Sequence, residues 1–213
     1  MSWDDLDEAH YEWPTLKRTQ NYRDAVYAKV SALIDTLPIT LPITQDSPWW
    51  VILMGIEHEN IHLETSSVLI RQLPLKALKA HPNWKECNIV GNAPKNELIE
   101  VNAGSVVLGK NKDASFFGWD NEYGEHQADI PTFKAARYLT SNAEFLEFVE
   151  EGGYGNDAFW SEEGQQWKAY KQAEYPQFWN KDVQGYRLRT LSQEIALPHN
   201  WPVEVNQLEA EAF

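Results

Sequence analysis

The sequence predicts an α+β fold in which helices come first and short strands with aromatic-rich loops follow. Up to about residue 74, apolar residues recur at the three- and four-residue spacing of helices. From about residue 98, short β-branched runs alternate with turn residues. Most of the 10 tryptophans and 9 tyrosines lie outside the first helices. Because such rings usually fill a core built from irregular loops, we expect the second part to form a separate, mixed α+β unit.

The composition of the chain excludes several classes of function. The length of 213 residues fits one large domain or two small ones. The net charge of −14, without any basic cluster, argues against binding to nucleic acid or to an anionic membrane. The single cysteine, Cys87, excludes an internal disulfide and suits a reducing cytoplasm. The polar, acidic start is unlike a signal peptide, and the longest apolar run, 49–56, is too short to cross a membrane. We therefore expect a cytoplasmic protein.

The first elements are predicted to be a loop, a helix, a linker and a second helix. Residues 1–15 form the loop, which has a surface or structural histidine, His10, and packing anchors at Trp3, Tyr11 and Trp13. Thr19 caps a helix over 20–37 whose apolar face carries Tyr22, Val26, Val30, Leu33 or Ile34, and Leu37. Prolines at 38, 42 and 48 keep the linker extended. Asp46 or Ser47 caps the second helix, which ends near residues 73–74.

The second helix carries the residues most suggestive of chemistry. His58 and His62 are four residues apart, so on a helix both imidazoles leave the same face about one turn apart. Imidazole is a ligand for zinc, iron, copper and nickel, and this spacing allows two rings to share one ion. The alternative is a polar stripe of hydrogen-bonded histidines on a bundle helix. The intervening HENIH pattern also matches the zinc-protease motif, in which Glu59 would be the general base. In either metal reading a further ligand must come from elsewhere.

The segment MGIEHENIHLETSSVLIRQLP resembles the DinB-like domain of the iron-dependent sulfoxide synthases. The resemblance is greatest to the 5-histidylcysteine sulfoxide synthases of ovothiol biosynthesis, and ergothioneine synthases share the more general His-x-x-x-His pattern. It implies a four-helix bundle and a non-haem Fe(II) ion held by His58, His62 and a histidine on an earlier helix. None of His10, His81, His126 or His199 matches that earlier ligand. Glu57, Glu59 and Glu64 would orient the rings or serve the bundle structurally.

The same resemblance implies the reaction and its partners. The family joins the sulfur of cysteine to the imidazole of histidine with O₂ and gives a sulfoxide, so the expected partners are these small molecules. A zinc-dependent hydrolase using HENIH is the alternative function.

A linker is predicted over residues 76–97, where HPNW at 81–84 and GNAP at 91–94 are turn sequences. His81 and Cys87 could form part of a metal site, but no second pair follows them, so we expect none. Residues 98–109 are expected to form strand, tight turn and strand around Ala103-Gly104. From here on the sequence resembles the opening of a formylglycine-generating-enzyme-like domain, which implies a C-type-lectin-like fold with few regular elements.

Two further helices are predicted in this part. Ser141 and Glu144 form a capping box for one helix, which Gly152-Gly153 ends, and Ser161 begins another. Asp120, Asn121, Glu122 and His126 could form a metal or substrate site, but hydrogen bonds that stabilise a turn are the preferred interpretation.

Asn206 and Glu209 again form a capping box, followed by too little chain to bury Leu208 and Phe213. We therefore expect a central fragment or a subunit of a sulfoxide synthase, inactive alone and completed by flanking polypeptide or by self-association. Residues 1–75 would be the end of the DinB-like bundle, 76–97 a linker, and 98–213 the start of the formylglycine-generating-enzyme-like domain.

Overall fold

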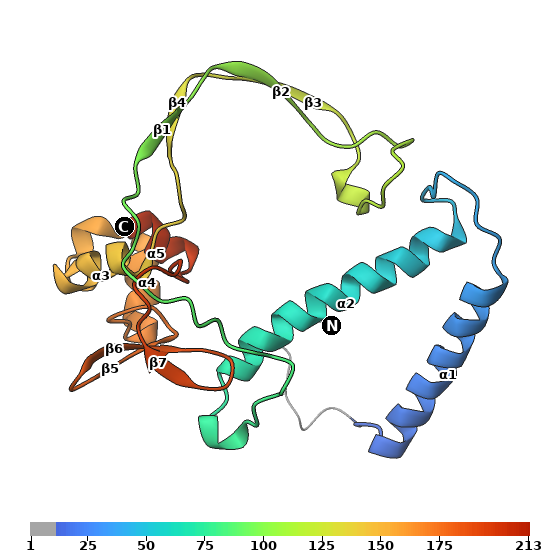
Figure 1. Cartoon of the computed structure of the whole chain (residues 1–213), viewed down its shortest axis with the longest axis horizontal. Coiled ribbons are helices and arrows are strands. Elements are labelled where there is room, and N and C mark those ends of the chain that lie inside the picture. The colour runs from blue at the N-terminus through green and yellow to red at the C-terminus, as the bar shows by residue number, and fades with distance from the viewer. Residues whose placement is uncertain (1–11) are drawn as a thin grey trace. The chain divides into compact units, whose positions relative to one another are not determined.

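The computed structural model describes residues 12–213 and confirms the mixed α+β architecture (Figure 1). The predictions for His10, Trp3 and Tyr11 lie outside the described residues. The helices are α1 (Leu16–Thr36), α2 (Pro48–Arg71), α3 (Asn142–Glu150), α4 (Glu162–Lys171) and α5 (Gln207–Ala212). The strands are β1 (Leu98–Val101), β2 (Gly104–Leu108), β3 (His126–Ile130), β4 (Phe133–Ala136), β5 (Trp179–Asp182), β6 (Gly185–Arg189) and β7 (Glu194–Ala196). Among the described helices, none is both long and apolar enough to cross a bilayer.

The two long helices exist as predicted, but the first begins four residues earlier than expected. Thr15, and not Thr19, is its N-cap, and the Thr15 hydroxyl accepts a hydrogen bond from the Arg18 amide at 3.3 Å. Leu16, Lys17 and Arg18 are good helix formers, so nothing delays the start once Thr15 has capped the first turn. Of the two predicted caps of α2, Asp46 and Ser47, the structure supports Ser47, whose hydroxyl accepts from the Trp49 amide at 3.3 Å.

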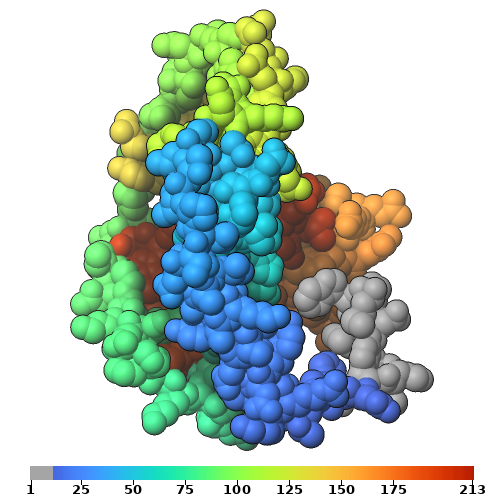
Figure 2. Space-filling view, turned by 90° about the vertical axis from the view of Figure 1, so that its right-hand side faces the viewer, coloured from blue at the N-terminus to red at the C-terminus, as the bar shows by residue number. Residues whose placement is uncertain are grey.

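The apolar faces of α1 and α2 are largely bare, as expected for two helices without bundle partners. Neither helix contains a buried residue. In Figure 2, α1 is drawn in blue beside α2 in cyan. α1 and the first half of α2 line an apolar groove of about 990 Å³, to which α1 contributes Val26, Val30 and Ile34 and α2 contributes Ile52 and Gly55.

A loop of residues 108–126 completes the unit that contains α1 and the first half of α2. The Trp50 indole donates to the Gly118 carbonyl at 3.2 Å and packs its ring against Phe117, with 5.5 Å between ring centroids. At Gly109, which has φ +108°, an added Cβ would lie 2.2 Å from the Gly124 carbonyl oxygen. The close approach of these two backbone segments therefore requires glycine.

The hairpin predicted over residues 98–109 is wrong in its pairing, although both strands exist. β1 pairs antiparallel with β4, with Leu98 opposite Ala136, and β2 pairs with β3, so the chain runs straight on through Ala103-Gly104. Gly104 is not among the glycines with positive φ, which the tight hairpin turns need. Instead, the Ala103 amide donates across the ribbon to the Thr132 hydroxyl at 3.1 Å. The result is the long two-stranded ribbon of Figure 1.

The main core lies in the part of the chain from α3 onward, where the predicted aromatic residues gather. Phe145 of α3, Trp160, Trp179 of β5 and Leu188 of β6 are buried there. β5, β6 and β7 form a three-stranded antiparallel sheet in which Trp179 lies opposite Leu188. The chain after Asn206 is too short to bury Phe213, as predicted, because this ring is 53% exposed, whereas Leu208 is partly buried. α5 nevertheless joins this core. Its Ala212 is buried, and the ring of Phe213 packs against Phe145 at 5.3 Å between centroids.

Two arginines connect the end of α2 to β6. The Arg71 guanidinium makes two hydrogen bonds of 2.7 Å to the Glu204 carboxylate and donates to the Arg189 carbonyl at 2.7 and 3.0 Å. It also stacks over the Phe178 ring at 3.8 Å. In return, the buried Arg189 guanidinium donates to the Leu73 carbonyl at 3.1 Å, just beyond the C-terminus of α2. Arg71 of α2 thus donates to a backbone carbonyl of β6, and Arg189 of β6 donates to the backbone carbonyl of Leu73, two residues after α2.

Arg71→Ala is expected to lower the free energy of unfolding by about 2 kcal/mol, because charge-assisted bonds and ring stacking are lost together. Arg71→Lys should recover little of the loss, since an ammonium cannot form the two-pronged contact. Glu204→Gln should cost less than about 1 kcal/mol, because Glu204 is 53% exposed. Urea unfolding of the three variants tests this order, and an equal loss in all of them would contradict it.

The capping box of α3 should make stability sensitive to acid. Burial acts to raise the pKa of Glu144, but hydrogen bonds from the Ser141 backbone and side chain and from Asn96 outweigh it, so the pKa lies below its ordinary value of 4.5. A carboxyl with a lowered pKa stabilises the fold above pH 4.5, and this stabilisation is lost as the pH falls through the folded-state pKa. Glu144→Gln should remove this part of the acid dependence, whereas Ser141→Ala should cost about 1 kcal/mol at neutral pH. Unfolding curves between pH 3 and 7 measure both effects; identical acid limbs in wild type and Glu144→Gln would oppose the assignment.

Candidate metal centre

The candidate centre rests on one helix, α2, which carries both predicted histidines. The helix is continuous from Pro48 to Arg71, so His58 and His62 occupy successive turns of one face. Both are exposed, and each already makes a non-covalent contact. Glu57, Glu59 and Glu64 are also exposed on this helix. An ion held here would remain accessible from solvent.

The residues present fit part of a metal site. Two neutral imidazoles one turn apart can share an ion, and this arrangement suits iron, cobalt or zinc. Among the described residues, no group of three or more histidine, cysteine, aspartate or glutamate side chains is placed to hold a metal. Within the described residues, His58 and His62 therefore supply two possible ligands, and a metal site would need at least one more.

Glu59, the general base in the protease interpretation, is exposed on the groove side of α2. It lines the apolar groove between α1 and α2, together with Gly55 and Ile56. His58 follows Gly55 by three residues, so helical geometry places it beside this groove-lining stripe. The pair and the groove are thus neighbouring features of the same helix.

The other candidate site of the sequence, around residues 120–126, is a structured turn. Asp120–Glu122 forms a short 3₁₀ helix, in which the Glu122 carboxylate accepts from the Trp119 amide at 2.6 Å and Asp120 accepts from the Asn121 amide at 3.1 Å. His126 begins β3. These bonds occupy the carboxylates in the way the preferred interpretation predicted.

His81 and Cys87 likewise form no metal cluster within the described residues. His81 instead closes the predicted turn, where its carbonyl accepts from the Trp84 amide at 3.0 Å. Cys87 is an exposed thiol.

Comparison with known proteins places the second part of the chain in a family. Residues 87–213, more than half of the chain, match the sulfatase-modifying factor enzyme 1-like domain. The chain belongs to this family. The resemblance of the sequence from residue 98 onward to a formylglycine-generating-enzyme-like domain is thereby confirmed, and the match begins before the ribbon of β1 to β4.

Relatives extend the similarity to the helical part. The chain is 32% identical over 199 residues to a hercynine oxygenase of Mycolicibacterium smegmatis, covering 90% of this chain and 42% of the relative. It is 33% identical over 192 residues to a hercynine oxygenase of Mycobacterium tuberculosis, covering 86% of this chain and 42% of the relative. An ergothioneine biosynthesis protein of Neurospora crassa is 22% identical over 151 residues, which are 66% of this chain and 17% of that protein. The chain thus spans about two fifths of the hercynine oxygenases to which it is distantly related.

Proposed function

We propose that this chain is part of a non-haem Fe(II), O₂-dependent sulfoxide synthase. The observation that carries the proposal is the His58–His62 pair on α2, a helix that precedes the sulfatase-modifying-factor domain in the same chain. The similarity to hercynine oxygenases supports the proposal, because it covers 90% of the chain and so includes this helix. We propose residues 1–75 as the end of a DinB-like bundle, 76–97 as a connector and 98–213 as the start of the formylglycine-generating-enzyme-like domain.

The proposed substrates are cysteine, histidine and O₂, as in ovothiol biosynthesis. The reaction forms a bond between the thiol sulfur and an imidazole carbon, with loss of one hydrogen from each. One oxygen atom of O₂ ends on the sulfur, and the other leaves as water with the two hydrogens. A second candidate for the imidazole substrate is hercynine, because two of the relatives are hercynine oxygenases.

In this proposal His58 and His62 would hold the iron, which would supply coordination positions for the thiolate and for O₂. The described residues offer no third ligand group, so we place that ligand on a segment outside residues 12–213 or on another polypeptide. A helix seated in the apolar groove beside His58 would bring a ligand into reach and cover the bare faces of α1 and α2. We therefore expect the chain alone to be inactive.

The test is anaerobic loading with Fe(II), then addition of cysteine, O₂ and either histidine or hercynine, with mass spectrometry of the sulfoxide product. It is run on the chain alone and on the chain mixed with the remaining segments of a related full-length synthase. Product in the mixture but not from the chain alone supports the proposal. Whether histidine or hercynine gives more product identifies the imidazole substrate. Full turnover by the chain alone would overturn the expected inactivity.

A peptidase assay of the zinc-loaded chain distinguishes the hydrolase alternative. Peptide cleavage that Glu59→Gln abolishes would favour a zinc hydrolase, because this substitution removes the proposed general base and leaves both histidines in place. Sulfoxide formation that survives Glu59→Gln in the reconstituted mixture would favour the synthase.

A further inference from the structure

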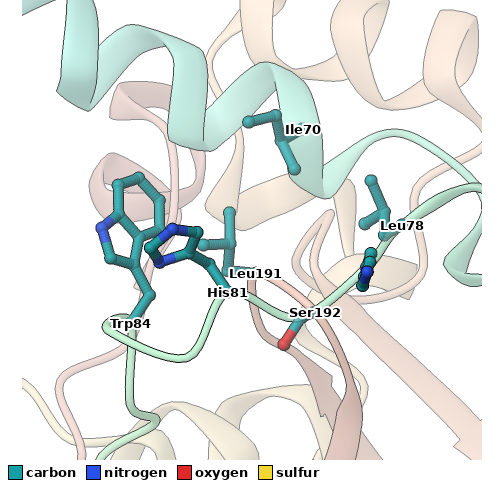
Figure 3. A pocket seen from close by; sticks show the side chains of 7 residues that line it. Ile70, Leu78, His81, Trp84, Leu191 and Ser192 are labelled. Atoms are coloured by element: carbon teal, nitrogen blue, oxygen red, sulfur yellow. The ribbon is translucent and has the colours of Figure 1, made fainter.

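A second cavity lies where the segment after α2 meets the turn between β6 and β7. It has a volume of about 360 Å³, within the range of small-molecule sites. Its walls come from Ile70 near the end of α2, Leu78 and Trp84 of the following segment, and Leu191 of the turn. Figure 3 shows the rings of His81 and Trp84 on one side of this pocket and Leu78 on the other. The pocket offers a flat aromatic wall and an aliphatic wall facing the same space.

Hydrogen bonds fix the walls of the pocket before any ligand arrives. The turn that carries His81 and Trp84 is closed by the Trp84 amide, which donates to the His81 carbonyl at 3.0 Å. The Glu86 carboxylate accepts from the Thr190 hydroxyl at 2.7 Å and from Ser192 at 3.4 Å, which joins this segment to the β6–β7 turn. A pocket held in this way loses little entropy when a ligand binds.

The polar residues of the lining are Lys79, His81 and Ser192. Lys79 is the one charged residue among the described residues of the lining. The His81 Nδ1 atom accepts from the Asn83 amide at 3.2 Å, so the neutral ring carries its proton on Nε2 and is a donor there. No aspartate or glutamate is among the described residues that line the cavity, although the chain has 32 acidic residues. The lining therefore suits a ligand with negative charge.

We propose that this pocket binds a small planar aromatic carboxylate. The ring would lie between Trp84 and the aliphatic wall of Ile70, Leu78 and Leu191, where it gains stacking and apolar contact. The carboxylate would pair with Lys79 and accept from His81 Nε2, because charge-assisted hydrogen bonds are the strong ones. Neither the iron pair nor the proposed reaction is needed for this site.

The probe is indole-3-acetate, and its matched control is indole-3-acetamide, which has the same ring and no charge. Binding to the full chain is followed by NMR shifts of the tryptophan indole N–H signals, with the Trp84 signal assigned from Trp84→Phe. We expect saturable binding of the carboxylate with a Kd of about 1 mM or tighter. The amide should bind at least about tenfold more weakly, because it lacks the ion pair.

Substitutions of the lining residues test whether the probes bind in this pocket. Lys79→Met keeps the length of the side chain and should weaken the carboxylate at least about tenfold while leaving the amide unchanged. Trp84→Ala should weaken both probes, and it removes no core residue because Trp84 is 47% exposed. Lys95→Met is the control, since Lys95 is 86% exposed and lies outside the lining. Equal binding of the two probes, wild-type binding by Lys79→Met, or no binding up to 10 mM would each overturn the proposal.

Discussion

Replacing either His58 or His62 with alanine is expected to weaken Co(II) or Fe(II) binding by the chain at least about tenfold. Loss of a residue that merely supports a ligand already costs about 10- to 100-fold in metal affinity, so loss of one of two ligands should cost no less. The two single variants should behave alike, because the rings occupy equivalent positions one turn apart on α2. Anaerobic titration with Co(II), followed through its visible absorption, measures the affinities.

A histidine elsewhere on the surface provides the control for this titration. His126→Ala, at the exposed start of β3, should leave Co(II) affinity unchanged, since no second histidine lies within four residues of it in the sequence. Adding free imidazole to His58→Ala should restore part of its affinity for Co(II). Equal affinity of wild type, His58→Ala and His62→Ala would exclude the pair as the metal site.

Local signals in the sequence predicted local structure well. The capping boxes of α3 and α5 appear as expected, because each depends on two side chains three residues apart. The start of α1 was placed too late because Thr15 and Thr19 are both able to cap, and the sequence alone does not decide between them. The histidine spacing on α2 could likewise be read directly, since one helix determines it.

Contacts between distant segments could not be read in the same way. The sequence suggests pairing β1 with β2 because they are neighbours in the chain, whereas β1 pairs with β4 and β2 with β3. The hydrogen bond from the Arg71 side chain to the Arg189 carbonyl joins residues 118 positions apart, and no pattern around either arginine indicates its partner. The sequence indicates too little chain after Asn206 to bury Leu208 and Phe213, and Phe213 is indeed 53% exposed. The burial of Ala212 could not be predicted, because it depends on the distant residues of the same core. Tertiary packing decided each of these cases.

The buried pair of Tyr154 and Glu209 should contribute more to stability than any surface ion pair. The Tyr154 hydroxyl donates to Glu209 Oε1 at 2.5 Å, and Oε2 of the same carboxylate accepts from the Asn206 amide at 2.9 Å. Glu209 is 2% exposed, so each lost bond leaves a buried group without its partner. Glu209→Ala removes both bonds, the second of which is one half of the α5 capping box, and we expect it to lower the free energy of unfolding by about 3 kcal/mol.

Tyr154→Phe keeps the ring and removes only the hydroxyl, so it isolates the hydrogen bond and its pH dependence. Burial, the hydrogen bond to Glu209 and the negative charge of that carboxylate hold the pKa of Tyr154 well above its ordinary value of 10. A group with a raised pKa stabilises the fold fully below pH 10, and this stabilisation is lost as the pH rises further, because only the unfolded chain then releases the proton.

Wild type should therefore lose about 1.4 kcal/mol per pH unit more than Tyr154→Phe above pH 10. Below pH 9 the variant should be less stable than wild type by about 1–3 kcal/mol. Urea unfolding between pH 7 and 11.5 measures the difference between the two proteins, so that the other tyrosines and the lysines cancel. Parallel curves across this range would show that the Tyr154 hydroxyl titrates as it does in the unfolded chain, contrary to the buried pair described here.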